Sequence, residues 1–593
     1  MTPAAGVTGS GRIPRPLQVI AEWLLALLHL VRRRLSAEWA TFPLYRIIIL
    51  DQPTATFLAF TPRDFRPVAV DQGRALLEGR LCVAGEASEI GVHGDPWDRP
   101  SPSRRFAAAL HQFSWLPGLL ATGATGEREA LRLFVTWRAE FERLSPFVWG
   151  SEILERRTFN LACGAHRMWP HASDEEARLL AVMLARHARR LARIDGPDIR
   201  RAQQLAVACI GAGALADPVG GTLLRRWLPR LARTLDRTVG EDGGIASRSP
   251  QQGLELLYDL LTLDDLLSQR GLAPPADLSR AIDALTATTA FLRLRDGRLA
   301  SFQGGSAVDA HHVDGALAQF DPASSGSTSR GRGGFHRIAS QRIEVLMDGA
   351  APAGGPFSVS ACDQPLAIEV VCNGERLITN CGWTPSGPLP EGLRLGPGGS
   401  TAALDGVSPG RLLTGLRRAG LGARLLRGAA TVSAQRTDTE DGAWMELQHD
   451  GWLRSRGLIH ARRLFVDHRT AELRGEDAIL AGTDCRRPGI VPYAVRFHVA
   501  AGVQVSLARD ERSVLLRGVS DQGWWLRNDA RDVVLEPTLI CLDGQPRRST
   551  QILLRGAVLP DGDGGRIRWK LTPVDPGTDP GRRRARDPGA LPA

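Results

Sequence analysis

Lysine is almost missing from this sequence of 593 residues, because only one of its 74 basic residues, Lys570, is not an arginine. Such a skew, beside so much alanine, glycine and proline, is typical of coding bias in a GC-rich genome. The formal net charge of +10 is therefore no sign of nucleic-acid binding, and we expect no nucleic-acid partner. Arginine still binds carboxylate and sulfate groups through two parallel hydrogen bonds, so an acidic polymer stays open as a ligand.

Paired cysteines and long hydrophobic runs are missing too. The eight cysteines are scattered without a Cys-x-x-Cys pair, which excludes a disulfide framework and a zinc finger. The apolar stretch from Ile20 to Val31, which runs into Arg32-Arg33-Arg34, is much shorter than the roughly 20 residues that cross a bilayer. Glu22 interrupts what would be the core of a secretion signal, so we expect no cleavable signal peptide. The cytoplasm and the periplasmic face of the cell envelope both stay open as the compartment.

Residues 17–40 are instead predicted to form an amphipathic helix that follows a disordered tail. A helix of this kind packs against the body of the protein or rests on a membrane surface, and the sequence leaves both alternatives open. A membrane surface, contacted through this helix, is therefore one partner to test.

The spacing of the apolar residues changes near residue 330. Up to about residue 295 it has the period of a helix, as in Leu180, Met183, Leu184 and Leu191, which fall on one helical face. After Gly333 the apolar residues form short runs, separated by glycine, aspartate and proline, which predict many short strands. A helical half followed by a sheet half indicates a multidomain α+β fold of two stacked modules, with a site where they meet.

Two loops in the helical half carry polar chemistry. In Asp242 to Pro250, Ser249 is placed to cap a helix and Pro250 to occupy its first position. Arg248 then lies at the mouth of that helix, where its guanidinium either faces a sugar carboxylate or is solvated in a loop. The second loop, Asp296 to Gly305, also ends a helix and is expected to line the same rim.

Short motifs are spread over most of the chain. They include Asp242-Gly-Gly and Asp296-Gly-Arg-Leu-Ala in the helical half, then Gly334-Phe-His-Arg-Ile338, Asn380-Cys-Gly382 and His449-Asp-Gly-Trp452 in the sheet half. In this order and spacing they resemble the heparinase II/III family of polysaccharide lyases, especially its alphaproteobacterial members. The resemblance implies an N-terminal (α/α) toroid of helical hairpins followed by a C-terminal antiparallel β-sandwich.

Domain boundaries follow from the pattern and the resemblance together. We expect a tail and amphipathic helix over 1–40, a lead-in of a few strands or loops over 41–104, the toroid over 105–325, the sandwich over 333–575, and a disordered tail over 576–593. The segment Ser306 to Arg332, rich in glycine, serine, alanine and aspartate, is predicted to be a linker or an exposed loop.

The chemistry that the resemblance implies is β-elimination at a uronic acid, without a cofactor. Such a lyase neutralises the sugar carboxylate, removes the C5 proton with a Tyr or His base, and protonates the leaving oxygen at C4. The sequence departs from the family where the family has an Asn-His pair, a Tyr and three further His, because those positions hold Pro197-Asp198, Gln252, Ile245, Cys362 and Gly399. The family's metal site in the sandwich is left with Cys362 and Asn380, and we expect no zinc.

The polar side chains that remain define the candidate site. The predicted catalytic residues are Arg248, Tyr258 as a base, His336 and Arg394, and the predicted substrate-binding residues are Asn380, Trp383, His460 and His498. Alternatives stay open, because Tyr258 lies among leucines as a core tyrosine would, and His460 and His498 lie in strand patterns where single histidines are often structural.

Three functions stay open at this point. The first, favoured because the resemblance spans the chain, is a lyase that cleaves or handles an acidic, uronate-containing bacterial polysaccharide by β-elimination. The second is a catalytically inactive relative that binds such a polymer in its groove at the cell envelope. The third is a membrane-associated scaffold that uses Ile20 to Arg34. The sequence fixes neither the polysaccharide nor the oligomeric state.

Overall fold

The structure is a computed structural model that describes residues 15–41, 55, 57–194, 198–320, 331–404, 407–426, 428–429, 431–482, 489–520, 522–559 and 564–574. The two predicted disordered ends, apart from residues 15–16, lie outside the described residues, as does most of the stretch 321–332. Residues 15–16 instead begin the first helix.

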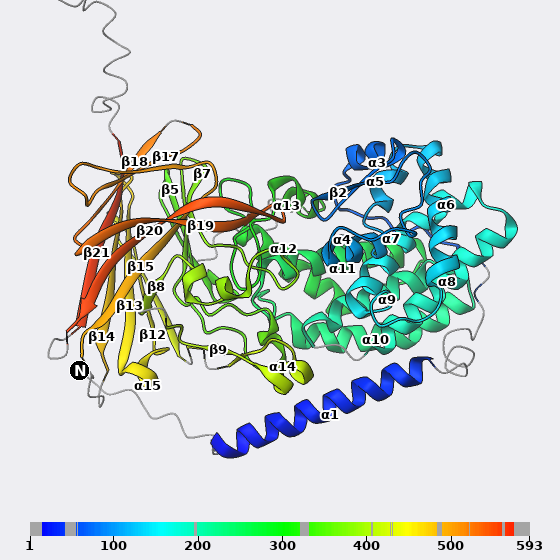
Figure 1. Ribbon diagram of the computed structural model, residues 1–593, viewed down its shortest axis with the longest axis horizontal. Helices are drawn as coiled ribbons and strands as arrows, with labels where there is room; N and C mark the ends of the chain where they lie inside the picture. Colours follow the sequence, from blue (N-terminus) through cyan, green and yellow to red (C-terminus); the bar gives the residue numbers. More distant parts are fainter. Residues whose placement is uncertain are drawn as a thin grey trace, which may run out of the picture.

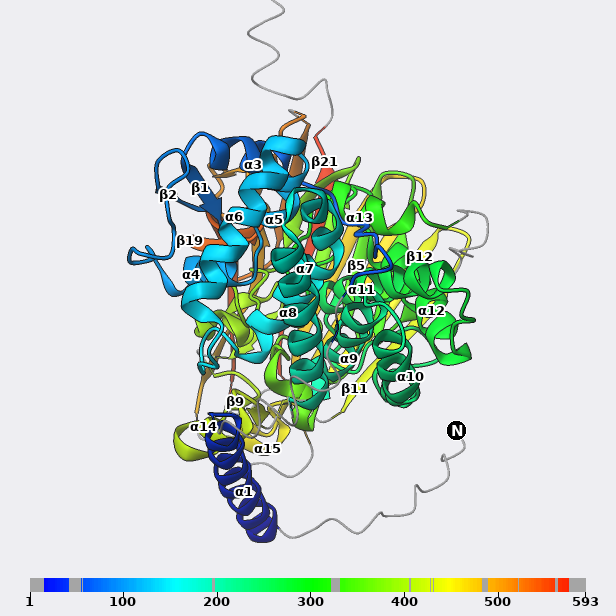
Figure 2. The same ribbon diagram turned by 90° about the vertical axis from the view of Figure 1, so that its right-hand side faces the viewer.

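The first part of the chain is helical (Figures 1 and 2). Its apolar residues form one core, in which Leu180, Met183 and Leu184 are fully buried, as the helical period predicts. The helices are α1 (Arg15–Thr41), α3 (Val70–Leu77), α4 (Arg104–His111), α5 (Leu116–Leu120), α6 (Ala124–Phe141), α7 (Ser151–Met168), α8 (Asp174–Arg193), α9 (Asp198–Gly213), α10 (Val219–Thr238), α11 (Pro250–Gln269), α12 (Ala276–Leu292) and α13 (Ala310–Leu317). Before α4 lies a short hairpin, β1 (Arg80–Val83) and β2 (Glu86–Glu89).

Helix α13 corrects one prediction. It lies inside Ser306 to Arg332, which was predicted to be a linker or an exposed loop. Asp309 caps it by accepting a hydrogen bond from the His312 backbone N–H at 3.0 Å, and Val313 and Ala316 are fully buried. Two buried residues on two turns are too few for a periodic signal in the sequence, so tertiary packing decides that this helix forms.

The second part of the chain forms two antiparallel sheets. The nine-stranded sheet has the order β19-β20-β15-β7-β6-β5-β4-β3, with β8 paired to β15, and the eight-stranded sheet has the order β11-β12-β13-β14-β21-β18-β17-β16. The strands of the first sheet are β3 (Gly331–Arg332), β4 (Phe335–Ala339), β5 (Ile343–Asp348), β6 (Ile368–Cys372), β7 (Glu375–Thr379), β8 (Ala402–Leu404), β15 (Val491–Val499), β19 (Asp532–Leu542) and β20 (Gln545–Val558). Those of the second are β11 (Val432–Asp438), β12 (Gly442–His449), β13 (Leu458–Asp467), β14 (Leu473–Ala481), β16 (Gln504–Leu507), β17 (Val514–Arg517), β18 (Gly523–Asn528) and β21 (Gly564–Pro573).

The nine-stranded sheet is covered on both faces. Val345 and Val370 point into the core that it shares with the eight-stranded sheet, whereas Leu346 and Val371 belong to the core of the helices. Strands β5 and β6 are therefore buried along their whole length. The predicted class, a helical part followed by antiparallel sheets, is confirmed. The two parts meet at the face of the nine-stranded sheet that carries Leu346 and Val371. Below, this surface is called the helix–sheet interface.

Helix α1 lies apart from the other helices, beneath both parts of the molecule (Figures 1 and 2). It contacts α14 (Gly415–Leu421), a short helix in the loops of the sheet part. None of the helices in the described residues is long and apolar enough to cross a bilayer.

Candidate functional site

Three acidic residues of the nine-stranded sheet point at the loops of the helical part. Glu344 and Asp348 come from β5 and Glu369 from β6, and all three side chains are buried. Because an unpaired buried carboxylate is strongly unfavourable, each of them requires cationic or hydrogen-bonding partners across the helix–sheet interface.

Arg248 supplies the partner of Asp348. Its Nη2 lies 2.5 Å from Asp348 Oδ1, and its remaining N–H groups donate to the backbone carbonyls of Gly333, Gly334, Ala350 and Ala351 at 2.9–3.3 Å. The guanidinium also lies 4.9 Å from the centre of the Phe335 ring. Arg248 thus lies where the two parts meet, as expected, but its donors are occupied by the protein itself. The structure contradicts both sequence interpretations, a guanidinium open to a sugar carboxylate and a solvated loop arginine.

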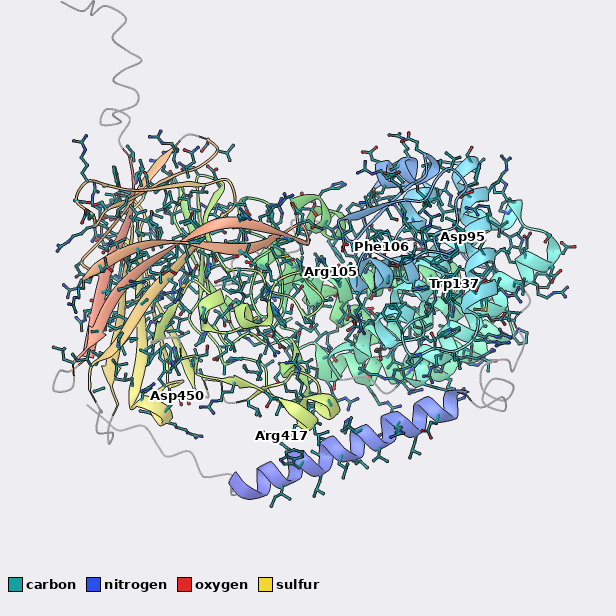
Figure 3. All side chains as sticks on the ribbon, viewed as in Figure 1. Asp95, Arg105, Phe106, Trp137, Arg417 and Asp450 are labelled. Atoms are coloured by element: carbon teal, nitrogen blue, oxygen red, sulfur yellow. The ribbon has the colours of Figure 1, made fainter. Side chains whose placement is uncertain are left out.

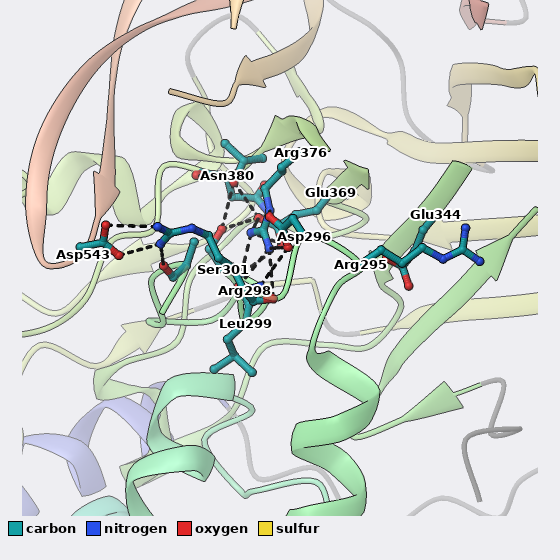
Figure 4. A network of polar contacts seen from close by, with 12 residues as sticks. Arg295, Asp296, Arg298, Leu299, Ser301, Glu344, Glu369, Arg376, Asn380 and Asp543 are labelled. Carbon is teal, nitrogen blue, oxygen red and sulfur yellow. Dashed lines mark hydrogen bonds and ion pairs between the residues drawn. The ribbon is translucent and has the colours of Figure 1, made fainter. Parts of the chain in front are cut away.

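The second predicted loop, Asp296 to Gly305, is tied to Glu369 (Figure 4). Arg376 of β7 bridges the two sides, since its Nε lies 2.8 Å from Asp296 Oδ2 and its Nη1 lies 3.2 Å from Glu369 Oε2. The Ser301 backbone N–H donates to Glu369 at 3.1 Å, and both the Ser301 and Thr379 hydroxyls donate to the same carboxylate. Both loops singled out in the sequence therefore lie at the interface, in structural ion pairs.

Little open space remains between the two parts at Arg248. The cavity that Arg248 lines with Ile245, Leu285 and Phe335 has a volume of about 20 Å³. A water molecule fits into such a volume, whereas a sugar ring does not.

Comparison with known proteins defines the family of this architecture. Residues 323–570 match the family model "Heparinase II/III-like, C-terminal". FtsZ-localized protein C of Caulobacter vibrioides is 44% identical over 546 residues, which cover 91% of this chain and 94% of that protein. The chain belongs to the heparinase II/III family. Among solved structures, heparinase III superposes with a TM-score of 0.66 at 11% identity, over 89% of each chain. Heparan sulfate lyase HepC of Pedobacter heparinus gives 0.51 at 12% identity, over 90% of this chain and 88% of that one. At such identities, these two matches show the polysaccharide-lyase fold alone.

In this member of the heparinase II/III family, two of the departures from the family motifs, Ile245 and Cys362, lie beside the Arg248 pair. Ile245 lines the small cavity, and the backbone N–H of Cys362 donates to Gln303 Oε1 at 3.0 Å. Gln303 Nε2 in turn donates to Asp348 at 2.7 Å. Neither the Ile245 side chain nor the buried Cys362 thiol, whose pKa burial raises to about 12, acts as an acid or base near neutral pH. Of the pair Pro197-Asp198, Pro197 lies outside the described residues.

The donors left at the family's metal site do not fit a metal ion. Zinc in proteins takes about four nitrogen, sulfur or oxygen ligands, and here only Cys362 and Asn380 stand at the matching positions. The Asn380 Oδ1 already accepts a hydrogen bond from the Ser400 backbone N–H at 2.9 Å. Within the described ranges, no three His, Cys, Asp or Glu side chains are grouped as a metal site would require.

Tyr258, the predicted base, lies inside the helical core. It is fully buried, its hydroxyl donates to the backbone carbonyl of His312, and burial raises its pKa well above the usual range. The Arg66 guanidinium covers its ring at 4.8 Å. A phenol in this setting holds α11 against α13 and does not face the interface, so the structure gives the base assignment no support.

His336 is the one predicted residue that lies near Arg248. It stands on β4, its ring fits against the glycines at positions 331 and 349, and a Cβ at Gly349 would come within 2.5 Å of its Cδ2. Burial lowers the pKa of His336. The Asp348 carboxylate raises this pKa, and the Arg248 guanidinium lowers it. The imidazole is therefore neutral near pH 7, but no sugar-sized space adjoins it in the cavity that Arg248 lines.

Arg394 and Trp383 form a separate buried group in the loops of the sheet part, whereas Asn380 directly follows β7 and lies by the Glu369 network (Figure 4). Arg394 donates to the backbone carbonyls of Ser358, Ala361 and Ala423, and its guanidinium lies 5.1 Å from the centre of the Trp383 ring. Burial lowers the pKa of Arg394. These contacts fix loops in place, so the predicted catalytic and sugar-stacking roles do not match the geometry.

His460 lies in the sandwich interior, whereas His498 points to the opposite face of the nine-stranded sheet from its neighbours Phe497 and Val499, and both histidines are far from open solvent. His460 Nε2 lies 2.8 Å from Asp477 Oδ1, and Arg462 Nε lies 2.7 Å from the same oxygen. His498 Nε2 contacts the Pro397 carbonyl at 3.0 Å and its Nδ1 contacts the Thr538 hydroxyl at 3.1 Å. Burial lowers the pKa of His498 to about 4. Both side chains are fully buried and hydrogen-bonded, which is the structural alternative that the strand patterns left open.

The residues that the sequence reasoning missed are the three buried acids and Gln303. A signal for the acids was present, because each stands in an otherwise apolar strand, as in Ile343-Glu-Val-Leu-Met-Asp348. A charge within such a run indicates a strand that is covered on both faces and paired across one of them.

Proposed function

We propose that this protein is a catalytically inactive member of the heparinase II/III family that lies on a membrane surface through α1. The observation that carries the proposal is the orientation of this helix. Most of its large apolar side chains point away from the protein, while Glu22, Trp23 and Ala26 contact it.

The inner side of α1 is held by α14 and the loops next to it. Arg417 Nη1 lies 3.2 Å from Glu22 Oε2, and its guanidinium lies 5.6 Å from the centre of the Trp23 ring (Figure 3). Ala26 is buried against Leu413 and Leu421. A small residue, an ion pair and the Trp23 ring therefore make this contact, which fixes which side of the helix faces outward.

The outer side carries what we call the outward stripe. Its residues recur at the helical period and are all about half exposed or more: Ile20, Leu24, Leu27, Leu28, Val31 and Leu35. A surface helix of a soluble domain buries such a stripe, since full burial of one Leu or Ile side chain is worth about 1.5–3 kcal/mol. Here the stripe faces solvent, and insertion into the headgroup and acyl boundary of a membrane removes it from water.

The helix–sheet interface supports the inactive state. Elimination requires a base, a cation for the carboxylate and room for the sugar at one place. Tyr258 is buried elsewhere, Arg248 is occupied by Asp348 and four carbonyls, and the cavity that Arg248 lines has room for a water. The related protein of Caulobacter vibrioides is named for its localisation with FtsZ, and we propose that this chain localises with FtsZ as well.

Vesicle flotation tests the proposal. The full chain is mixed with vesicles of phosphatidylethanolamine and phosphatidylglycerol, and its co-flotation is compared with that of the double variant Leu24→Glu, Leu28→Glu. The variant should lose about tenfold or more of the bound fraction at an unchanged melting temperature. The matched control, Val92→Glu with Leu272→Glu, changes two exposed apolar residues of the helical part and should float like wild type. A wild-type protein that stays unbound, or a stripe variant that floats equally, would exclude membrane docking through α1.

The second candidate is the lyase, which the shared fold with heparinase III favours. Elimination leaves a double bond conjugated to the uronate carboxylate, so the product absorbs in the far ultraviolet. Incubation with alginate, heparan sulfate and other uronate polymers should leave the absorbance unchanged if the protein is inactive. A rise that depends on the protein would establish the lyase instead.

A further inference from the structure

The outer face of the eight-stranded sheet carries an ordered row of aromatic and basic side chains. The antiparallel register places Trp444 opposite Phe465, Phe465 opposite Arg474, Arg474 opposite Lys570, and Lys570 opposite Arg527. These five residues, on β12, β13, β14, β21 and β18, are called the outer row. Their strand neighbours, such as Met445 and Leu571, point the other way into the sandwich core.

One end of the outer row is aromatic. The rings of Trp444 and Phe465 lie 4.6 Å apart at 35°, and Trp444 is 40% exposed. The Arg474 guanidinium lies 5.7 Å from the centre of the Phe465 ring. Phe465 is buried, so the exposed Trp444 ring beside the Arg474 cation is the apolar contact surface next to a charge.

The other end has three cations directly opposite one another on neighbouring strands, which are about 4.8 Å apart. Like charges in this arrangement repel. Glu472 neutralises part of the repulsion, at 3.0 Å from Arg474 and 3.2 Å from Lys570. Within the described ranges Arg527 has no carboxylate partner, since its contacts are the Thr572 hydroxyl and the Trp525 ring. An anionic ligand here relieves the repulsion that remains.

A groove of about 520 Å³ runs along the outer row. Its acidic residues are already in use, because Glu476 lies 3.0 Å from Arg568 and Asp529 accepts the Arg568 backbone N–H at 2.7 Å. The groove therefore presents more hydrogen-bond donors than acceptors, beside the exposed Trp444 ring. A matching ligand brings negative charge and apolar side chains and needs few donors.

We propose that the outer row binds an acidic segment of a partner protein, in which carboxylates stand beside aromatic or aliphatic side chains. The carboxylates meet Arg527, Lys570 and Arg474, and the apolar side chains pack on Trp444. An acidic polysaccharide fits less well, because its hydroxyls are donors as well as acceptors and the groove offers few acceptors. The outer row lies on the side of the sandwich away from the helices, and α1 lies beneath the molecule, so membrane docking leaves this face accessible (Figure 1).

The single lysine of the chain makes a direct test practicable. The full-length protein is incubated with fluorescein-labelled poly(Glu,Tyr), which carries carboxylates and aromatic rings, or with poly(Glu), or with heparin and alginate oligosaccharides. Binding is followed by fluorescence anisotropy. Occupancy is followed by acetylation of the Lys570 amine, which is half exposed, with mass spectrometry as the readout. We expect poly(Glu,Tyr) to bind most tightly, to protect Lys570, and to bind less tightly as salt rises.

Two variants and a control locate the site. Arg474→Gln with Arg527→Gln should weaken poly(Glu,Tyr) binding about tenfold or more, and Trp444→Ala should abolish its preference over poly(Glu). Arg74→Gln with Arg280→Gln removes the same charge from exposed positions of the helical part and should change nothing. The proposal is overturned if both double variants behave alike, if poly(Glu,Tyr) leaves Lys570 unprotected, or if an oligosaccharide protects Lys570 better at equal carboxylate concentration. None of these outcomes depends on whether α1 binds vesicles.

Discussion

Arginine side chains serve opposite purposes on the two sides of the sheet part. At the helix–sheet interface Arg248 and Arg376 are nearly buried, and each is bound to carboxylates and backbone carbonyls of the protein. On the outer row Arg474 and Arg527 are exposed, and Arg527 contacts a hydroxyl and a ring. In the family's lyases the first surface is where the resemblance implies a substrate site, and here it is sealed. The buried arginines therefore stabilise the contact between the two parts, whereas the exposed arginines of the outer row remain able to bind a ligand.

The largest effect should come from breaking the sealed interface. Arg248→Met leaves Asp348 buried without its cation, so the free energy of unfolding should fall by about 3–5 kcal/mol, as measured by urea denaturation. Arg74→Met, at an exposed position, should stay within about 0.5 kcal/mol of wild type. If Arg248→Met is as stable as wild type but loses affinity for an acidic oligosaccharide, Arg248 is a ligand-binding residue and the comparison fails.

The stability of the folded protein should depend on pH through buried histidines, whereas the exposed residues of the outer row should not contribute to this dependence. The folded protein holds the pKa of His498 at about 4, against about 6.5 in the unfolded chain. Above pH 6.5 both states are neutral and the stability is fully present. Between pH 6.5 and 4 only the unfolded chain takes up the proton, so stability falls as the pH falls, by roughly 3 kcal/mol from this residue. His111, whose burial also lowers its pKa to about 4, acts in the same window.

Denaturation curves at pH 7 and pH 4.5 measure this loss. The variant His498→Gln should be less stable at pH 7 but should show a smaller difference between the two pH values than wild type. An equal difference in both proteins would mean that His498 takes up no proton in this window.

The smallest effect concerns the loop that carries Arg248. Ser249 caps α11 by accepting the Gln252 backbone N–H, as its position before Pro250 predicts. Ser249→Ala should cost about 1 kcal/mol of unfolding free energy, because one donor at the helix start loses its partner. Ser268→Ala, on the exposed side of the same helix, should cost nothing. An unchanged stability of Ser249→Ala would show that the ion pair of Arg248 alone holds this loop.

Much of the fold followed from the sequence, and the site did not. The helical period of α8, the Ser249 cap and the short apolar runs of the sheets are local patterns, and the structure confirms the elements that they predict. Helix α13 was missed because its two buried residues give no period. Arg248, Tyr258 and Arg394 were assigned to chemistry because their partners stand far away in the sequence, as Asp348 does from Arg248. Whether a polar side chain is occupied depends on these distant partners.

The sequence by itself determined most of the helices and strands and the spacing of the apolar residues on α1, since these are carried by residues close together in the chain. It also indicated the family, through the order and spacing of short motifs along the chain. Only the tertiary structure decided that the interface is sealed, that the outward stripe of α1 points away from the protein, and that the outer row forms across five strands. The physical reason is the same in each case. Burial and pairing depend on surfaces brought together from distant parts of the chain, and no local pattern encodes which face of an element ends in solvent.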